Sequence, residues 1–385
     1  MCIHILRQFL RPSRKDIWYS AFYCIWAGCD LPWRMIHMKK ILVAGGSGYI
    51  GSHICVELIN EGYEPFVIDN LYNSSEESLK RVREITGKEV SFYRADFLNA
   101  PEIDRIFKSE MPEAVIMCAG YKAVGESVAK PLEYYYNNLN SLMICCDVMR
   151  KNGCRNIIFS SSATVYGDPA EIPITEACPK GEITNPYGKT KGMIEDILID
   201  MNKADSSLNV VLLRYFNPIG AHQSGLIGED PNGIPNNLVP YIAQVAIGKR
   251  DAVHVFGNDY DTPDGTGVRD YIHVVDLAKG HVAAIRKLES DSGLFVYNLG
   301  TGHGYSVLEV IDAYEKACGK KLNRIIDPRR PGDIACCYCD PEKAERELGW
   351  KAELGIYEMC RDSYNWQSKN PDGYGACEHA GICLE

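Results

Sequence analysis

Residues 39–51 read KKILVAGGSGYIG, and this stretch decides the fold. Lys39–Ala44 is a short apolar run of the kind found in a parallel strand buried on both faces. Three glycines follow, at Gly45, Gly48 and Gly51, and lead into an apolar pattern with helical spacing. In such a unit the first glycine permits a tight turn, the second lets the backbone approach a pyrophosphate, and the third allows close packing of helix on strand. The stretch therefore predicts the start of a dinucleotide-binding α/β fold.

A second apolar run, Pro65–Asp69, follows this unit and ends on a carboxylate. Asp69 comes at nearly the spacing from Gly45, roughly 20 residues, at which such a unit places an acid on the adenosine ribose. A carboxylate there repels the 2′-phosphate of NADP, and neither Asn70 nor Leu71 is basic. NAD is therefore the predicted cofactor. A glycine-rich turn without a ligand is the weaker alternative, because strand, loop, helix, second strand and acid occur in the expected order.

Apolar runs alternate with helical patterns beyond this unit. We expect further strands at Val90–Asp96, Ala114–Ala119, Asn156–Ser161 and Val210–Arg214, and a helix at Glu133–Asn152. Such alternation is typical of a Rossmann-type doubly wound parallel sheet.

Loops rich in Gly, Pro and Asn dominate after about residue 214, for example at 217–235 and 257–267. They predict a smaller mixed α/β domain at the carboxyl ends of the strands, where open α/β sheets bind ligands. We expect an NAD-binding domain at 38–215 and a substrate-binding domain at 216–376, from which some segments cross back to the first. Residues 377–385 form a tail without an interpretation.

The composition limits the classes of partner. The chain has 385 residues, a net charge of −10, 46% hydrophobic and 24% charged residues, which fits a globular protein with a sizeable core. An acidic chain without a basic block is a poor match for nucleic acid, so no such partner is expected. The 16 cysteines are scattered, as in a reducing cytoplasm. Cys336 and Cys339 have no second ligand pair, so no metal site is predicted.

Residues 1–37 differ from the rest. Basic residues precede an apolar run at Ile17–Ala27, and Ala27-Gly-Cys29 follows, which resembles an exported lipoprotein signal. The run is too short to span a bilayer. We favour the alternative that translation starts at Met38, because a nucleotide-binding strand begins at Lys39 without a linker. A cytoplasmic protein without a membrane partner is expected.

Tyr187 and Lys191 form a second motif. Their spacing puts both on one face of a helix that follows Pro186. A neighbouring ammonium and the positively charged nicotinamide would each favour a phenolate and lower the pKa of Tyr187. The pattern alone arises by chance, but here it follows SSSATVYG at 160–167, where hydroxyls end a strand. Ser162 could share a hydrogen bond with a substrate hydroxyl, and capping of a helix or turn is the alternative.

These motifs resemble the extended short-chain dehydrogenase/reductase superfamily, and within it the family of UDP-hexose 4-epimerases. The more specific strings are AGYKAVGES at 119–127, LRYFNP at 213–218, GIPNNL at 233–238, FGNDY at 256–260 and GTGVRDYIH at 265–273. The resemblance runs from about Lys39 to Tyr374, nearly the whole chain.

The resemblance implies an isomerase of galactose metabolism that interconverts UDP-glucose and UDP-galactose by transient oxidation at sugar carbon 4, with NAD retained. It places Tyr187, Lys191 and Ser162 in catalysis. Around NAD it places Gly45, Gly48, Tyr49, Ile50, Gly51, Asp69, Asn70, Asp96, Phe97, Lys122, Asn137, Tyr187, Lys191 and Phe216. Around the UDP-sugar it places Ser162, Asn217, Asn237, Leu238, Arg269, Arg330, Asp333 and Cys337.

Three positions depart from the commonest pattern of the family. Phe97 stands where an aliphatic residue is usual and Cys118 where an aromatic is usual, and both concern cofactor packing. Cys337 stands where members restricted to glucose and galactose carry a bulky Tyr. The family pattern therefore implies added activity on UDP-N-acetylglucosamine and UDP-N-acetylgalactosamine.

Three alternatives stay open. A dehydratase needs an acid pair beside the active serine, where this chain has Ala163 and Thr164. A non-enzymatic NAD sensor usually loses the Tyr or the Lys, and an alcohol dehydrogenase would need added cofactor during turnover. The family is often dimeric, so we expect a homodimer. Leu142, Met143 and Cys146 could line its seam, although core packing explains them equally well.

Overall fold

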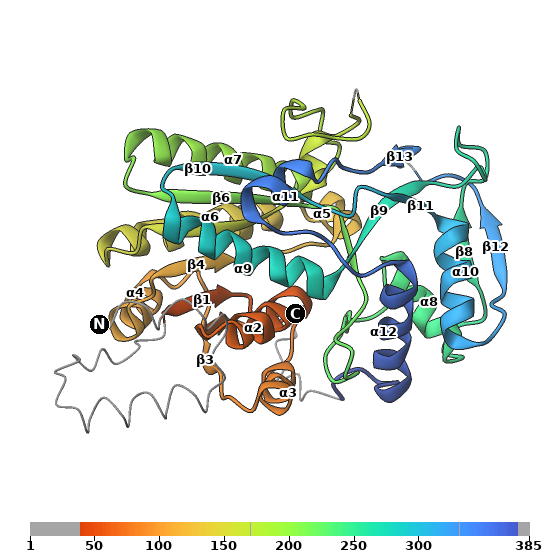
Figure 1. Cartoon of the computed structure of the whole chain (residues 1–385), viewed down its shortest axis with the longest axis horizontal. Coiled ribbons are helices and arrows are strands. Elements are labelled where there is room, and N and C mark those ends of the chain that lie inside the picture. Colours follow the sequence, from red (N-terminus) through yellow and green to blue (C-terminus); the bar gives the residue numbers. More distant parts are fainter. Residues whose placement is uncertain (1–38, 170, 331, 376–385) are drawn as a thin grey trace, which may run out of the picture. The chain divides into compact units, whose positions relative to one another are not determined.

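The computed structural model describes residues 39–375 except 170 and 331, so the interpretations of residues 1–37 and of the tail lie outside the described residues. A seven-stranded sheet runs in the order β10-β6-β5-β4-β1-β2-β3, and every neighbouring pair is parallel (Figure 1). Its strands are β1 (Lys40–Ala44), β2 (Glu64–Asp69), β3 (Ser91–Arg94), β4 (Ala114–Met117), β5 (Asn156–Ser162), β6 (Asn209–Tyr215) and β10 (Leu294–Leu299). The predicted doubly wound sheet is confirmed.

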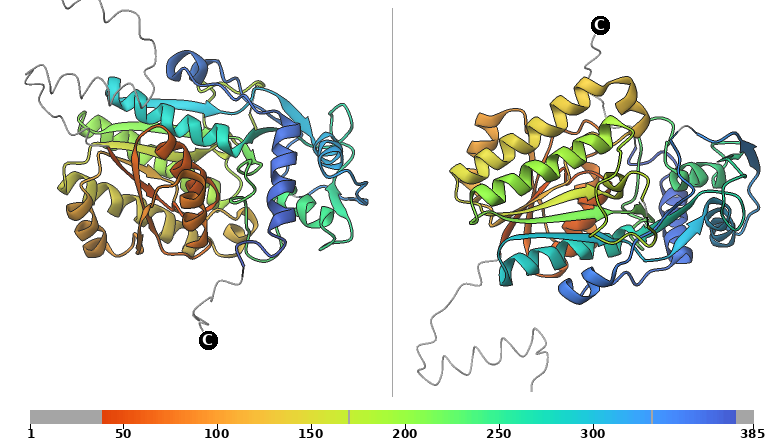
Figure 2. Two further views of the ribbon diagram at one scale, coloured as in Figure 1. Left: turned by 60° about the horizontal axis from the view of Figure 1, so that its bottom comes forward. Right: turned by 90° about the horizontal axis from the view of Figure 1, so that it is seen from above.

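The first strand shows why both faces of the sheet are covered. Ile41 and Val43 enter one apolar cluster, whereas Leu42 and Ala44 enter another, because successive side chains of a strand point to opposite faces. Figure 2 shows the two helical layers on either side of the sheet. The first cluster packs α2 (Tyr49–Asn60), α3 (Glu77–Thr86) and α9 (Val274–Ser290), and the second packs α4 (Ala100–Glu110), α6 (Pro131–Lys151) and α7 (Pro186–Ala204).

The chain reverses direction across the sheet between β1 and β4. From β1 it proceeds outward through β2 and β3, then returns to the other side of β1 for β4, β5 and β6. Open α/β sheets bind ligands in the crevice at the carboxyl ends of the strands beside such a reversal. The short α5 (Val124–Ala129) and the single turn η1 (Ala163–Tyr166) follow β4 and β5 there.

The rest of the chain forms smaller sheets around a third apolar cluster. Strand β9 pairs with β7, β11 and β13, and β8 pairs with β12. The elements are β7 (Asn217–Ile219), α8 (Leu238–Ala246), β8 (Val253–Phe256), β9 (Val268–His273), β11 (Gly304–Ser306), α10 (Val307–Cys318), β12 (Arg324–Asp327), β13 (Cys336–Cys337), α11 (Glu342–Leu348) and α12 (Ile356–Lys369). Helices α8, α10 and α12 enclose Ile242, Tyr314 and Met359.

Three elements from the range 216–376 return to the large sheet. Strand β10 pairs with β6, and α9 and α11 pack on the first apolar cluster. The sequence reasoning allowed for such a crossing but did not identify this strand, and the division into domains stays a prediction. Among the described residues, no helix combines the length and apolar character needed to cross a bilayer.

Candidate active site

The loop after β1 requires glycines because other backbone atoms approach it closely. Gly45 has a φ of 76°, which glycine adopts at little cost. A Cβ on Gly45 would lie 3.0 Å from the backbone of Ala119, and one on Gly51 would lie 2.4 Å from the carbonyl oxygen of Gly45. Gly48 caps α2 without a side chain, so no side chain occupies the amino end of that helix. Free N–H groups and the helix dipole make this end suited to a phosphate.

Asp69 fastens this loop to the turn after β2. Its carboxylate accepts hydrogen bonds from the N–H of Ser47 at 3.2 Å, the N–H of Leu71 at 2.9 Å and the hydroxyl of Ser74 at 2.9 Å. Burial raises the pKa of Asp69, and these bonds lower it. A carboxylate has about four acceptor positions, so one is left for a ribose hydroxyl.

Other predicted cofactor ligands take different positions. Asn70 donates a hydrogen bond to Asp96 at 2.9 Å, so the structure brings these two together. Phe97 and Phe216 are buried in apolar clusters, at 4% and 5% exposure. Asn137 donates to its neighbour Asn138.

Helix α7 presents the predicted acid–base pair. Asn185 caps the helix by accepting a hydrogen bond from the N–H of Gly188 at 2.8 Å, and Pro186 occupies the first turn. Tyr187 therefore lies in the first turn, and Lys191 lies one turn further on the same face. The predicted helix start is confirmed.

Both side chains reach the end of β5. The hydroxyl of Ser162 faces the phenol of Tyr187 and lowers its pKa. The Oγ of Ser162 also accepts from the N–H of Thr164 at 3.2 Å, so Ser162 caps η1 as well. The ammonium of Lys191 donates to the carbonyl oxygen of Ser160 at 2.6 Å and lies 5.8 Å from the ring of Tyr187. The three predicted catalytic residues are thus brought together.

The protein groups around Tyr187 do not by themselves lower its pKa. Burial raises the pKa of Tyr187 to about 12, and Ser162 opposes this only in part. Burial likewise lowers the pKa of Lys191, whose side chain is buried, to about 8. Sequence spacing identified the partners but not this burial, and desolvation disfavours each charged form. The lowering expected from the nicotinamide stays a prediction.

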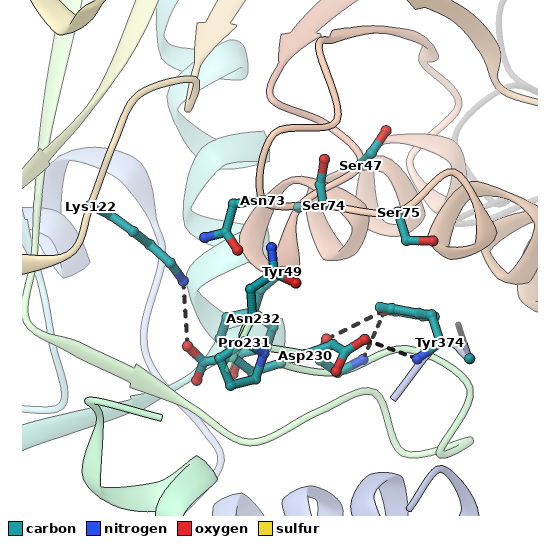
Figure 3. A pocket seen from close by; sticks show the side chains of 14 residues that line it. Ser47, Tyr49, Asn73, Ser74, Ser75, Lys122, Asp230, Pro231, Asn232 and Tyr374 are labelled. Atoms are coloured by element: carbon teal, nitrogen blue, oxygen red, sulfur yellow. Dashed lines mark hydrogen bonds and ion pairs between the residues drawn. The ribbon is translucent and has the colours of Figure 1, made fainter. Parts of the chain in front are cut away.

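A pocket opens between the glycine loop and a segment from the far side of the site (Figure 3). We call residues 228–232 the strap. The pocket is lined by Ser47, Gly48, Tyr49, Asn73, Ser74, Ser75, Lys122, the strap, Tyr374 and Gly375. Lys122 reaches across it to Glu229 of the strap, with 3.4 Å between the charged atoms. The hydroxyl of Tyr49 donates to the carbonyl oxygen of Gly220 at 2.7 Å.

The strap is fastened on its outer side. The hydroxyl of Tyr374 lies 3.3 Å from both the N–H and the carbonyl oxygen of Gly228, and its backbone N–H donates to Asp230 at 2.9 Å. The guanidinium of Arg81, on α3, lies 4.9 Å from the ring of Tyr374 and 5.5 Å from that of Trp366. Sequence reasoning missed the strap and Tyr374, because their place beside the glycine loop depends on tertiary contacts.

The cations predicted to hold a diphosphate gather near β9. Arg269 on β9 is paired in register with Cys337 on β13. Arg330 donates to Asp333 at 3.0 Å. The charges of Arg269, Arg330 and Asp333 all act on the phenol of Tyr271, whose pKa burial raises to about 12. The structure therefore brings these four predicted substrate residues into one neighbourhood.

The remaining predicted substrate residues lie at element ends. Asn217 begins β7, and Asn237 and Leu238 stand at the start of α8. The amide of Asn237 donates to Glu229 of the strap at 3.1 Å. Asn237 is thereby linked to the same strap carboxylate that pairs with Lys122.

Comparisons with known proteins agree with this geometry. The NAD dependent epimerase/dehydratase family matches residues 41–300. The UDP-glucose 4-epimerase of Bacillus subtilis (strain 168) is 62% identical over 338 residues, covering 88% of this chain and 99% of the relative. The UDP-glucose 4-epimerase of Bifidobacterium longum, solved in complex with NAD+ and UDP, is 60% identical with a TM-score of 0.85, covering 87% of this chain and 100% of that one.

A more distant solved structure is the UDP-Glc/GlcNAc 4-epimerase of Campylobacter jejuni. It is 34% identical with a TM-score of 0.75, covering 86% of this chain and 99% of that one. These matches cover most of this chain. The chain belongs to the NAD dependent epimerase/dehydratase family, and curated relatives at 56–62% identity, matched over nearly their whole length, are UDP-glucose 4-epimerases.

Proposed function

We propose that the chain interconverts UDP-glucose and UDP-galactose by inverting carbon 4 of the sugar, with NAD retained between turnovers. The observation that carries this proposal is that Tyr187 and Lys191, one helical turn apart on α7, meet Ser162 at the carboxyl end of β5. A glycine loop suited to a dinucleotide lies at the carboxyl end of β1 in the same sheet.

Tyr187 is the proposed acid and base. As a phenolate it accepts the proton of the sugar 4-hydroxyl, and it returns that proton once the 4-keto sugar has turned over. The Oγ of Ser162 already accepts from Thr164, so its own hydroxyl proton is free to stabilise the phenolate. The ammonium of Lys191 adds a positive charge near the same oxygen. Bound NAD supplies the acceptor for the hydride of carbon 4.

Inversion requires a firmly held UDP and a sugar that can present both faces. We propose that Arg269 and Arg330 hold the diphosphate, because guanidinium groups pair bidentately with phosphate oxygens. Asn217, Asn237, Leu238 and Asp333 complete the proposed UDP site. The sugar then has its anchor at one end only and can rotate about its link to the diphosphate.

We also propose turnover of the N-acetylated UDP-hexoses. Cys337 lies beside Arg269, near the proposed diphosphate, and its side chain is much smaller than tyrosine. The space left by a short side chain suits an acetamido group. The proposal is supported by the solved Campylobacter jejuni relative, which is named a UDP-Glc/GlcNAc 4-epimerase.

A homodimer is proposed from an apolar face on α5, α6 and α7. Leu132 and Tyr136 on α6 are 75% and 62% exposed, and Met143 and Met193 are also exposed. Helices α6 and α7 lie side by side on the outside of the sheet (Figure 2). Of the residues considered from sequence, Leu142 and Cys146 are buried in the second apolar cluster, which is the core packing that the sequence left open.

We place the reaction in the cytoplasm, where NAD and nucleotide sugars are available. Every described cysteine is a free thiol, as a reducing compartment would leave it.

A proton NMR time course tests the proposal. Protein purified from Met38 is mixed with UDP-galactose and UDP-N-acetylgalactosamine, without added NAD. Conversion of both sugars to mixtures with their 4-epimers supports the reaction, retained NAD and the open pocket. Conversion of UDP-galactose alone contradicts the role of Cys337. Turnover only with added NAD indicates a dehydrogenase-like exchange, and no turnover at all indicates an NAD sensor.

A further inference from the structure

Helix α7 contacts β5 through three polar side chains rather than two. Tyr187, Lys191 and Glu195 are spaced one turn apart and share one face of the helix. Tyr187 faces Ser162, Lys191 donates to the carbonyl oxygen of Ser160 at 2.6 Å, and Glu195 accepts from the hydroxyl of Ser161 at 2.6 Å. Three consecutive serines are therefore matched by three successive turns of α7, and the reaction described above uses only two of these turns.

Glu195 is a buried carboxylate held by a buried cation. It has no exposed surface, and Arg214 is 6% exposed. The guanidinium of Arg214 donates through Nε to Oε1 at 3.0 Å and through Nη2 to Oε2 at 2.8 Å, a bidentate geometry. Its third nitrogen donates to the hydroxyl of Tyr166 at 2.9 Å. Replacing a buried ion pair with apolar side chains often leaves the stability unchanged. Stability alone therefore does not explain why this pair is present.

The charge of Glu195 acts on Lys191. Lys191 faces Cys118 after β4, the Phe159 ring and Ser160 carbonyl on β5, and Tyr187 and Glu195 on α7. Glu195 in turn contacts the cations Arg214 and Lys180, the second at 3.6 Å. Tyr215 of β6 lies beyond Ser160 and bonds to His281 of α9. Burial lowers the pKa of Lys191 to about 8, while Cys118 and Glu195 raise it.

The other groups near Lys191 are neutral or positive. Burial raises the pKa of the Cys118 thiol to about 11 and lowers the pKa of His281 to about 4, so both are uncharged at neutral pH. Burial also raises the pKa of Tyr215. Among the groups just named, Glu195 is therefore the one resident carboxylate.

We propose that Glu195 is a positioning residue of this site: it sets the register of α7 on β5 and keeps the ammonium of Lys191 charged beside Tyr187. The inference rests on the proposed function, because it concerns the acid–base unit of that reaction. Glu195 itself touches neither the expected sugar nor the expected cofactor, since its carboxylate is enclosed by Ser161 and Arg214, with the ammonium of Lys180 at 3.6 Å.

The test is the pH profile of kcat for the NAD-loaded enzyme with UDP-galactose. Glu195→Gln keeps the shape of the side chain and an acceptor for Ser161 but removes the charge. Lys191 then loses its proton at lower pH, so the alkaline limb moves down by about one pH unit. The ratio of kcat at pH 9 to kcat at pH 7 falls about fivefold. Asp200→Asn is the matched control, because Asp200 is an exposed carboxylate on the same helix that pairs with Lys203, and it leaves the profile unchanged.

A loss of kcat by one factor at every pH would overturn the electrostatic role of Glu195. Glu195→Gln leaves Arg214 buried without a carboxylate, so a second variant guards against misfolding. Glu195→Asp keeps the charge but draws it away from Ser161, and we expect a lower kcat with the alkaline limb unmoved. A limb that moves as far in Glu195→Asp as in Glu195→Gln also overturns the inference. An inactive wild type would refute the proposed function itself, and with it this role.

Discussion

Replacing Lys191 with methionine separates the catalytic use of the buried ammonium from its cost to the fold. The ammonium lies 5.8 Å from the ring of Tyr187. At an effective dielectric constant of about 20, a charge at that distance stabilises a phenolate by about 3 kcal/mol. That energy corresponds to a change of about two in the pKa of Tyr187, and thus to about 100-fold in the phenolate population. We therefore expect Lys191→Met to lower kcat about 100-fold.

The same substitution is expected to stabilise the fold. Burial lowers the pKa of Lys191 from its usual 10.5 to about 8, so below pH 8 the folded state holds this proton less tightly than the unfolded state does. The destabilisation is about 3 kcal/mol at pH 7 and is relieved as the pH rises from about 8 to about 10.5. Methionine carries no charge to desolvate, so the melting temperature should rise at pH 7.

The assay is the NMR time course with NAD content measured on the same samples, beside thermal unfolding at pH 7. Lys189→Met is the control, because that lysine is exposed on the same helix. A kcat within a few-fold of the wild type would refute the electrostatic account of Lys191. A lower melting temperature would refute the claim that burying the ammonium is costly.

Three further predictions concern the pocket and the surface. Arg81→Ala removes a cation from the rings of Tyr374 and Trp366. We expect NAD release to become about 5- to 30-fold faster, measured as the NAD absorbance that remains after dialysis, while kcat with excess NAD is unchanged. Cys337→Tyr should reduce turnover of UDP-N-acetylgalactosamine about tenfold or more and spare UDP-galactose, because a bulky ring fills the proposed pocket. Leu132→Glu should convert a dimer to a monomer in light scattering, because like charges would meet in the seam.

Each of these has a clear contrary result. Unchanged NAD retention in Arg81→Ala would show that the contacts of Arg81 with Tyr374 and Trp366 do not help to retain the cofactor. Equal losses for both sugars in Cys337→Tyr would show that this position does not select between them. A wild type that is monomeric at all concentrations would remove the basis for the seam at Leu132.

Local pattern predicted the elements that position the site. The apolar run of β1, the glycines after it and the spacing of Tyr187 and Lys191 each express their structure within a few residues of chain. The acid at Asp69 could be predicted for the same reason, because it ends the next strand. These features depend on hydrogen bonding and burial within one strand–loop–helix unit. The order of residues along the chain is therefore enough to predict them.

What the sequence missed depends on tertiary contacts. The charges near Tyr187 were expected to lower its pKa, but burial in the folded protein raises it. Tyr374 lies far along the chain from the glycine loop, and only the packing of α12 brings it there. Nothing in the local sequence distinguishes Glu195 from an exposed helical acid, because its partners Ser161 and Arg214 come from β5 and β6.

The most direct test of the central claim uses UDP-galactose that carries deuterium at sugar carbon 4. The enzyme as purified, without added NAD, is incubated with it in ordinary water, and the UDP-glucose formed is analysed by NMR and mass spectrometry. A hydride that leaves carbon 4 and returns to its other face within one retained cofactor predicts full retention of the deuterium in UDP-glucose. Loss of the deuterium to solvent during conversion would contradict this account.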